Sequence, residues 1–390
     1  MNTPSDGDIT SERSLIAIMS ATNFVIGMGA FMVIGMLPPL AADLGLSVSL
    51  AGWVMTIYAI AYAVTSPLLV SATGRVGRRK VLFAGLSIFA MANLLAALAP
   101  NEGVLFIARA LAAVGAGITT PVTAAVVAGV VAPQQRARSL ASVMFGLTLA
   151  QVIGVPAGGF VAFTFGWRFA FLIVAIIALP CLFLIWTRVP RGLHFQPVGL
   201  RDLGAVIADG PIMLAILVTA TFLGAIYVPL TFLASLLEEV MGYGRNGISG
   251  ILLCLGLAAV FGNLLGGWMA DRFGPTRTLL FLALTQIVAM PLFSTLPMAG
   301  WLLFTLVFVW STFGWSITAP QQARIISLRP ERAPVVLSLN AAAIYIGAAL
   351  GSAIGGAVIA GHGLIALGIA GGLGAAIALA NIILSARISG

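Results

Sequence analysis

Long apolar runs separated by short polar loops dominate the chain. Twelve runs approach or exceed the roughly 20 residues that an α-helix needs to cross a bilayer. They cover residues 14–37, 50–71, 81–99, 104–130, 139–164, 167–187, 211–236, 247–270, 278–297, 300–322, 334–360 and 363–386. Because an unpaired backbone group is costly in hydrocarbon, helices are the economical way to span it. The pattern predicts an all-α membrane protein with twelve transmembrane helices.

Composition supports this interpretation. Of the 390 residues, 61% are apolar and 8% are charged, against roughly 25% charged in an ordinary soluble domain. A soluble enzyme, a disordered chain and a disulfide scaffold are excluded, and we expect no catalytic residue, metal or cofactor. Cys181 and Cys254 lie inside apolar runs, where small buried side chains are expected rather than a redox pair. The run after the polar N-terminal segment is too long for a signal-peptide core, so no cleaved presequence is expected.

Basic residues are distributed unevenly between the two sets of loops. The loops after even-numbered runs contain Arg75, Arg78, Arg79, Lys80, Arg136, Arg138, Arg188, Arg191, Arg201, Arg272, Arg277, Arg324, Arg329, Arg332 and Arg387. The opposite loops contain only Arg168 and Arg245. By the positive-inside rule, the end of the molecule that carries the first set, called here the arginine-rich end, should face the cytoplasm together with both termini. The net charge of +8 therefore comes mainly from basic residues that set the orientation in the membrane. It does not indicate a nucleic-acid partner.

A short repeat divides the chain. Gly74-Arg75-Val76-Gly77-Arg78-Arg79 follows the second run, and Asp271-Arg272-Phe273-Gly274 follows the eighth. Each copy lies in the loop after the second helix of its own six-helix half. The predicted organisation is a tail at 1–13, an N-terminal six-helix bundle at 14–187, a linker at 188–210 and a C-terminal six-helix bundle at 211–390.

These loops resemble the G-x-x-x-D-R-x-G-R-R signature of the major facilitator superfamily, specifically its twelve-helix drug–proton antiporter and sugar-efflux branch. The second copy begins at Gly267 and fits well, whereas the first has Val70 and Gly74 in place of the glycine and the aspartate. The resemblance implies two pseudo-symmetric six-helix bundles, the major facilitator fold. It also implies a conformational latch built from Arg75, Gly77, Arg78, Arg79, Gly267, Asp271, Arg272 and Gly274.

The latch has a physical rationale and an alternative. The glycine of each loop is expected to permit a tight turn with positive φ. Its arginines can cap helix ends and pair with acids across the two halves. The alternative is that these arginines only obey the positive-inside rule.

Two further segments resemble motifs of the same family. Around Arg109 the fourth run resembles the family's fourth-helix motif, whose embedded arginine is tied to substrate or proton handling. The fifth run resembles the glycine–proline antiporter motif, which implies a hinge at Gly154, Pro156 and Gly159. Small residues permit close helix contact, and proline bends a helix. The four-residue glycine spacing at Gly347, Gly351 and Gly355 is interpreted as helix packing.

Polar residues inside the apolar runs are the candidate substrate contacts, because each needs a partner or a cavity. Arg109 is the only charged residue placed clearly within a run, and snorkelling to the outer surface is the alternative to a cavity. The neutral candidates, for which helix–helix hydrogen bonding or interfacial anchoring is the alternative, are Asn23, Tyr58, Gln151, Tyr227, Asn263, Trp310, Trp315, Asn340 and Tyr345.

The acidic residues avoid the middle of every run. The eleven acids, all in tails, loops or helix ends, are Asp6, Asp8, Glu12, Asp43, Glu102, Asp202, Asp209, Glu238, Glu239, Asp271 and Glu331. Proton antiport usually relies on an embedded carboxylate, and Ala30 stands where the branch carries a glutamate before Phe31. Neither His194 nor His362 is placed as a central relay. We expect a neutral to positive cavity that accepts neutral or anionic amphipathic molecules better than permanent cations.

The sequence thus predicts a secondary transporter of the bacterial inner membrane. It should export a small organic compound (a drug, a sugar-like molecule or a nucleoside) by alternating access, and the resemblance implies proton-coupled antiport and a link to drug resistance. Uptake or facilitated diffusion remains open, as does a non-transporting membrane sensor or scaffold. Expected partners are the substrate, protons and membrane lipid, and the expected state is a monomer.

Overall fold

The computed structural model describes residues 6–132, 135–193 and 200–389, where every regular element is a helix. In this part of the chain, 12 helical segments are long and apolar enough to cross a membrane, which confirms the predicted spans. Residues 1–5 of the predicted tail and 194–199 of the predicted linker, including His194, lie outside the described residues. The predicted cytoplasmic orientation and the domain boundaries stay predictions.

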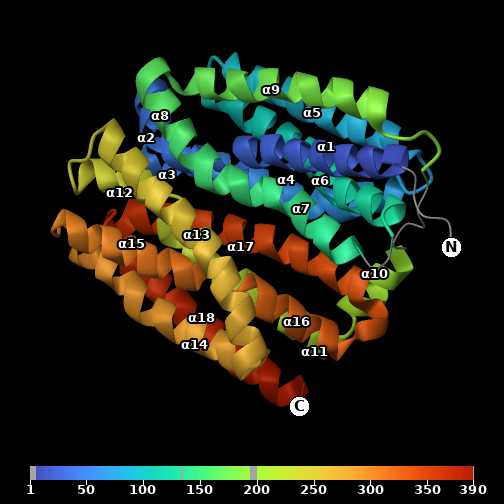
Figure 1. Cartoon of the computed structure of the whole chain (residues 1–390). Coiled ribbons are helices and arrows are strands. Elements are labelled where there is room, and N and C mark those ends of the chain that lie inside the picture. The colour runs from blue at the N-terminus through green and yellow to red at the C-terminus, as the bar shows by residue number, and fades with distance from the viewer. Residues whose placement is uncertain (1–5, 133–134, 194–199, 390) are drawn as a thin grey trace.

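The N-terminal half forms one group of helices, drawn in blue to green in Figure 1. Its elements are α1 (Asp6–Phe31), α2 (Val33–Leu44), α3 (Val48–Ala51), α4 (Trp53–Ala72), α5 (Arg78–Ala97), α6 (Glu102–Val130), α7 (Arg136–Leu149), the π-helix η2 (Ala150–Gly154), α8 (Val155–Phe165) and α9 (Trp167–Arg188).

The C-terminal half forms the second group, which follows the short helix α10 (Leu200–Ile207). Its elements are α11 (Gly210–Leu230), α12 (Leu233–Glu239), α13 (Arg245–Phe273), α14 (Pro275–Ala289), the 3₁₀-helix η3 (Met290–Thr295), α15 (Gly300–Trp315), α16 (Thr318–Leu328), the 3₁₀-helix η4 (Pro330–Arg332), α17 (Ala333–His362) and α18 (Ala366–Ser389).

Several spans are interrupted where the chain cannot continue a regular α-helix. The first span changes from α1 to α2 at Met32, and the fifth passes through the π-helix η2 directly before Pro156. Proline has no N–H to donate to the carbonyl four residues earlier, so the helix widens just ahead of it. The sequence analysis expected a bend at this motif, and the structure locates the irregular turn at Ala150–Gly154.

Glycine allows neighbouring helices to touch backbone to backbone. A Cβ atom on Gly351 of α17 would lie 2.2 Å from the carbonyl oxygen of Gly224 on α11, and one on Gly347 would lie 2.7 Å from that of Ala220. Gly355 is similarly close to Val228. The interpretation of this glycine stripe as packing is confirmed. Without a hydrophobic driving force in lipid, such close contact is what holds helices together.

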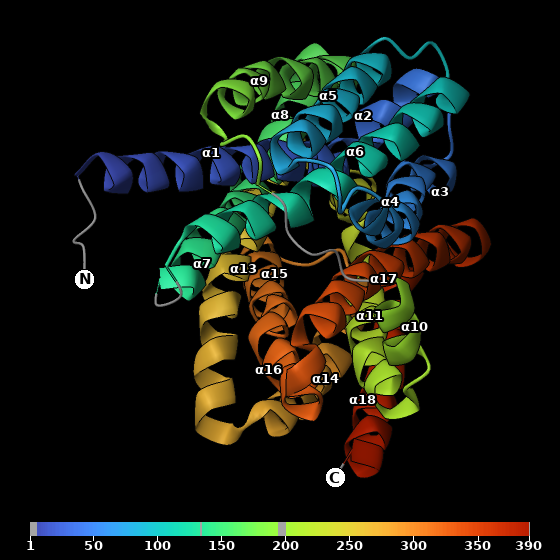
Figure 2. The ribbon, with the colours of Figure 1, turned by 90° about the vertical axis from the view of Figure 1, so that its right-hand side faces the viewer.

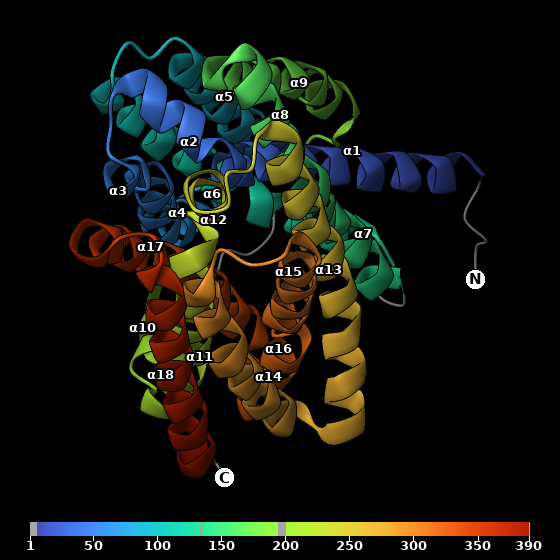
Figure 3. The ribbon, with the colours of Figure 1, turned by 90° about the vertical axis from the view of Figure 1, so that its left-hand side faces the viewer.

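The two halves meet at the end opposite the arginine-rich end. There α2 packs on α12, α8 on α13, and α3 and α4 on α17. Ser49 Oγ donates to the carbonyl of Gly356 at 2.7 Å, and Ser352 Oγ to that of Gly52 at 3.0 Å. Toward the arginine-rich end the ribbons of the two halves diverge, as Figures 2 and 3 show from opposite sides. The molecule is closed at one end.

Arg324 lies inside the tenth span, not in the loop expected from the sequence. α16 continues to Leu328 and buries Arg324, whose guanidinium donates to Ser385 Oγ on α18 at 2.8 Å. The polar sequence Pro320-Gln321-Gln322-Ala323-Arg324 masks the end of the span. Arg109 is therefore one of several buried arginines among the described residues.

The glycine contact gives a first test. We expect Gly351→Ala to lower the thermal unfolding temperature of the purified protein, because the added methyl group overpacks the α11–α17 contact at a cost of about 1–3 kcal/mol. Gly361→Ala on the same helix is the control, since nothing lies within 4 Å of its Cβ position. Unchanged or raised stability in Gly351→Ala would contradict the packing role.

Candidate functional site

A cluster of tyrosines lies where the two halves meet. Tyr58 and Tyr62 come from α4 and Tyr345 from α17, and these three residues are called the tyrosine cluster. The Tyr62 and Tyr345 rings stack with centroids 3.6 Å apart, and Tyr58 lies 6.4 Å and 6.5 Å from them. Tyr58 and Tyr62 are buried. The cluster lies midway along its helices, beyond the serine contacts of the closed end and before the halves diverge.

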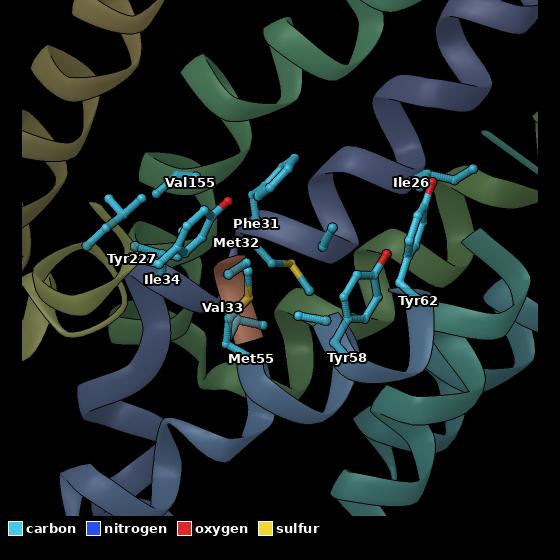
Figure 4. Packing of buried hydrophobic residues seen from close by; sticks show 14 of the residues in the cluster. Ile26, Phe31, Met32, Val33, Ile34, Met55, Tyr58, Tyr62, Val155 and Tyr227 are labelled. Carbon is cyan, nitrogen blue, oxygen red and sulfur yellow. The ribbon is translucent and has the colours of Figure 1, made fainter. Parts of the chain in front are cut away.

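The tyrosine cluster faces the break in the first span. Figure 4 shows Tyr58 and Tyr62 rising from α4 with their hydroxyl ends directed toward α1. The hydroxyl of Tyr58 is buried and has no hydrogen-bond partner among the described residues. A buried donor that is left unpaired costs roughly 1–3 kcal/mol. A polar group of a ligand could satisfy Tyr58.

Arg109 of α6 lies directly behind Tyr58. Its side chain is fully buried, and its guanidinium carbon lies 4.3 Å from the centroid of the Tyr58 ring and 5.7 Å from that of Phe171. The guanidinium donates to the carbonyls of Gly29 at 2.7 Å, Val54 at 3.3 Å and Ala30 at 3.4 Å. Arg109 does not snorkel to the surface. It binds carbonyl oxygens and aromatic faces in place of a carboxylate.

The local sequence explains why the guanidinium reaches the backbone there. Gly29 and Ala30 occupy the last turn of α1, where carbonyls lose their helical partners and attract cations. Their small side chains leave the carbonyls accessible. Ala30 stands where the family branch carries a glutamate, so the position expected for the acid lies beside the embedded arginine. The sequence could not supply this juxtaposition, because it joins residues 79 positions apart.

Two of the three asparagine candidates, Asn23 and Asn340, tie helices together within one half each. Asn23 Nδ2 donates to the carbonyl of Val143 at 3.2 Å, and its Oδ1 accepts from Thr123 at 3.1 Å. Asn340 Oδ1 accepts from Thr219 on α11. Both side chains are buried. These contacts match the helix-bonding alternative, and a substrate role for either residue stays a prediction.

The remaining candidates are scattered. Tyr227 is buried on α11, and its Cβ faces Gly351. Trp310 packs edge-on against Phe293 at 5.0 Å inside the C-terminal half, and its indole N–H has no partner among the described residues. Gln151, Asn263 and Trp315 are half-buried on η2, α13 and α15. Of the ten substrate candidates, the structure joins Tyr58, Tyr345 and Arg109 in one site.

Sequence reasoning missed Tyr62, which makes the closest aromatic contact between the halves. A signal was present, because Tyr62 lies four residues after Tyr58 and therefore on the same helix face. The stacking partner, Tyr345, comes from the other half. No local pattern could have paired them.

The latch residues lie at the arginine-rich end, in separate halves. Gly274 has φ of 85°, as expected, whereas Gly77 has φ of −56° and caps α5 in an ordinary conformation, so the prediction of positive φ was wrong there. Gly77 differs because several residues connect α4 to α5, whereas Gly274 is the single residue between α13 and α14 and must make the turn itself. Gly267 packs near Ala319 of α16, and Asp271 and Arg272 are exposed. Arg78 is buried, and its N–H donates to the carbonyl of Leu193 at 3.0 Å.

The hinge residues pack on the broken first span. A Cβ atom on Gly154 would lie 3.0 Å from Met28, and one on Gly159 would lie 3.0 Å from the carbonyl oxygen of Gly35. Pro156 begins α8. The two interrupted spans of the N-terminal half therefore lie against each other. Their role as a hinge stays a prediction.

At the closed end, Asp43 holds the N-terminal half together. Trp167 Nε1 donates to its carboxylate at 3.0 Å, and the Arg168 guanidinium forms an ion pair with it. Arg168 also donates to the carbonyl of Ala99 at 3.0 Å. The hydrogen bond from Arg168 and then that from Trp167 hold the pKa of Asp43 below its usual range. The acids of the described spans lie at helix ends or in loops, as expected.

Comparisons with known proteins bear on this arrangement. The family model described as Major Facilitator Superfamily matches residues 19–352. The inner membrane transport protein YdhP of Escherichia coli K12 is 30% identical over 368 residues, covering 93% of this chain and 94% of YdhP. A probable sugar efflux transporter of Mannheimia succiniciproducens is 26% identical over 366 residues, covering 93% of this chain and 91% of that protein.

A solved structure has a similar fold. A bacterial homolog to the human lysosomal transporter Spinster, crystallised in an inward-facing and unoccupied conformation, superimposes with a TM-score of 0.79. It is 19% identical, and the match covers 99% of this chain and 98% of that one. The match supports the fold of twelve helices in two halves.

Arg109 can be tested by a charge-conserving change. We expect Arg109→Lys to lower the thermal unfolding temperature, because a single ammonium group cannot reach three carbonyls on two helices. Hydrogen bonds from a charged donor are worth about 1.5–3 kcal/mol each. Arg277→Lys, at an exposed site near the start of α14, is the matched control. If both variants unfold at the wild-type temperature, Arg109 does not organise the break between α1 and α2.

Low pH should weaken the interactions of the Asp43 carboxylate with Arg168 and Trp167. Because the folded-state pKa lies below the ordinary value of 3.8, its stabilisation is present above about pH 4 and is lost as pH falls through the folded pKa. We therefore expect Asp43→Asn to unfold earlier than wild type at pH 7, with a smaller difference near pH 3. The pair is half-exposed, so the difference is at most about 1 kcal/mol. A constant difference at both pH values would contradict the assignment; Glu102→Gln is the control.

Proposed function

The chain belongs to the Major Facilitator Superfamily, and from this premise we propose that it is a secondary transporter that exports a small organic compound carrying no permanent positive charge. Transport proceeds by alternating access, in which the two halves rock around the tyrosine cluster. The protein is a multi-pass membrane transporter rather than an enzyme.

The charge around Arg109 is the observation that carries this substrate class. Its guanidinium is fully buried, and its partners are three carbonyls and two aromatic rings. Like charges repel strongly at low dielectric, so a permanent cation beside Tyr58 is disfavoured. A neutral or anionic compound meets no such penalty, and it can accept a hydrogen bond from the unpaired Tyr58 hydroxyl.

The tyrosine cluster suits a sugar-like or aromatic compound. Ligand sites combine apolar and aromatic walls with a few polar groups that fix orientation. Tyrosine supplies both from one side chain. The name of the Mannheimia relative, a probable sugar efflux transporter, agrees with this class.

The asymmetry of closure supports alternating access. The halves touch at one end through Ser49, Ser352 and Arg245, and diverge at the arginine-rich end. With the arginine-rich end in the cytoplasm, this is an inward-facing state in which a compound enters from the cell interior. Stacking of Tyr62 on Tyr345 then forms the floor of the route and must separate for release outside.

The driving force we propose is an inward proton gradient, as in the antiporter branch that the sequence resembles. A specific observation favours a second candidate, facilitated diffusion. The described spans place Asp and Glu only near their ends, and Ala30 replaces the branch's acid beside Arg109. Antiport therefore requires a proton carrier other than a mid-span carboxylate.

Flux in proteoliposomes tests the proposal. With radiolabelled methyl glucoside as neutral probe and tetraphenylphosphonium as permanent cation, we expect flux of the former only. Tyr62→Leu should reduce that flux up to about tenfold through loss of the stacked pair, whereas Tyr62→Phe should retain most of it. Tyr243→Leu, which lies in the loop before α13, is the control.

Two outcomes would overturn parts of the proposal. Efflux of tetraphenylphosphonium by the wild-type protein would reject the charge argument. Glucoside flux that does not change when a pH gradient is imposed would reject proton antiport and leave facilitated diffusion.

A further inference from the structure

A pocket with four basic side chains lies at the arginine-rich end, away from the tyrosine cluster. It has a volume of about 630 Å³ and is formed by the loop between α4 and α5 and by the end of α9. Arg75, Arg79, Lys80 and Arg191 supply the charge, and Trp186 supplies an aromatic wall. These five residues are called the basic pocket.

The basic pocket is held in shape by short contacts. The Arg79 guanidinium carbon lies 4.6 Å from the centroid of the Trp186 ring, which in turn packs against Phe83 at 4.9 Å. The backbone N–H of Arg78 donates to the carbonyl of Leu193 at 3.0 Å and connects the chain after α9 to the start of α5. The two walls are therefore fixed relative to each other.

No acidic residue forms an ion pair with the basic pocket in the described structure. The ion pairs there join Asp43 to Arg168 and Asp209 to Arg329, and neither includes a residue of the basic pocket. The family's loop signature has an aspartate where this chain has Gly74, so the acid that would lie next to Arg75 is missing. The equivalent loop of the C-terminal half retains its acid, Asp271.

The surroundings of the basic pocket belong to the membrane boundary. Both walls belong to membrane-spanning helices, α5 and α9, which lie side by side along the edge of the molecule (Figure 1). Below the pocket, α9 exposes an apolar stripe at helical spacing: Leu179 is 57% exposed, Phe183 68% and Trp186 46%. A basic rim above an exposed apolar stripe matches the two parts of a phospholipid.

We propose that the basic pocket binds the phosphate headgroup of an anionic phospholipid, whose acyl chains lie along the exposed stripe of α9. Arginine donates paired N–H groups to phosphate oxygens, which gives both strength and orientation. The lipid phosphate supplies the negative charge that Gly74 does not. This assignment does not depend on which compound is transported.

Native mass spectrometry of the purified full chain tests the proposal, with phosphatidylglycerol and phosphatidylcholine as probes. We expect preferential retention of phosphatidylglycerol, weakened about tenfold or more in the Arg79→Gln/Arg191→Gln double variant. The charge-preserving Arg79→Lys/Arg191→Lys variant should restore most of the binding. Arg272→Gln/Arg277→Gln, in the equivalent loop beside Asp271, is the matched control and should bind as wild type does.

A second readout reports the position of the lipid. Phosphatidylglycerol with brominated acyl chains should quench a tryptophan fluorescence component that is lost in Trp186→Phe, and brominated phosphatidylcholine should not. Equal loss of lipid binding in both glutamine double variants would show that binding depends on the general surface charge and not on the basic pocket. That result would overturn the proposal. Displacement of the lipid by millimolar inorganic phosphate would also overturn it, in favour of a free-anion site.

Discussion

The absence of water in the membrane interior is the constraint on which the whole structure depends. A polar group there that finds no partner within the protein is costly. Arg109 meets this demand in an unusual way, because its partners are carbonyls from α1 and α4 and the ring of Tyr58 rather than an acid. The guanidinium therefore does three things at once. It stabilises the end of α1, fixes α4 against α6, and supports the tyrosine that faces the meeting point of the halves.

Small residues make the remaining contacts possible. Gly29 and Ala30 leave backbone carbonyls open to Arg109, Gly35 lets α2 rest on α8, and Gly351 lets α17 rest on α11. In each case a small or missing side chain brings polar backbone within reach of a partner or permits a tight van der Waals contact. The high glycine content of the chain, 45 residues, is thus part of the same solution as the low charge content.

How much the sequence could predict depended on the range of the interaction. The twelve spans and the packing role of Gly347, Gly351 and Gly355 follow from local periodicity, and both were confirmed. The stacking of Tyr62 on Tyr345 joins residues far apart in the chain, so no periodicity could reveal it. The contact of Arg109 with Ala30 was missed for the same reason. Arg324 was misplaced because polar neighbours hid the continuation of α16.

The strengths of these contacts also divide in a way that suits a moving transporter. Within each half the contacts are strong and sterically specific. They include the hydrogen bonds of Arg109 to backbone carbonyls, the hydrogen bond between Thr219 and Asn340, and the close glycine packing of α17 on α11. Between the halves the directional contacts are hydrogen bonds from Ser49 and Ser352, one from the half-buried Arg245 to Thr164, and one stacked pair, each worth about 1–2 kcal/mol. Conformations that interconvert readily must differ by only a few kcal/mol. Weak contacts between halves that are rigid within themselves meet that requirement, whereas an ion pair buried between them would lock one state.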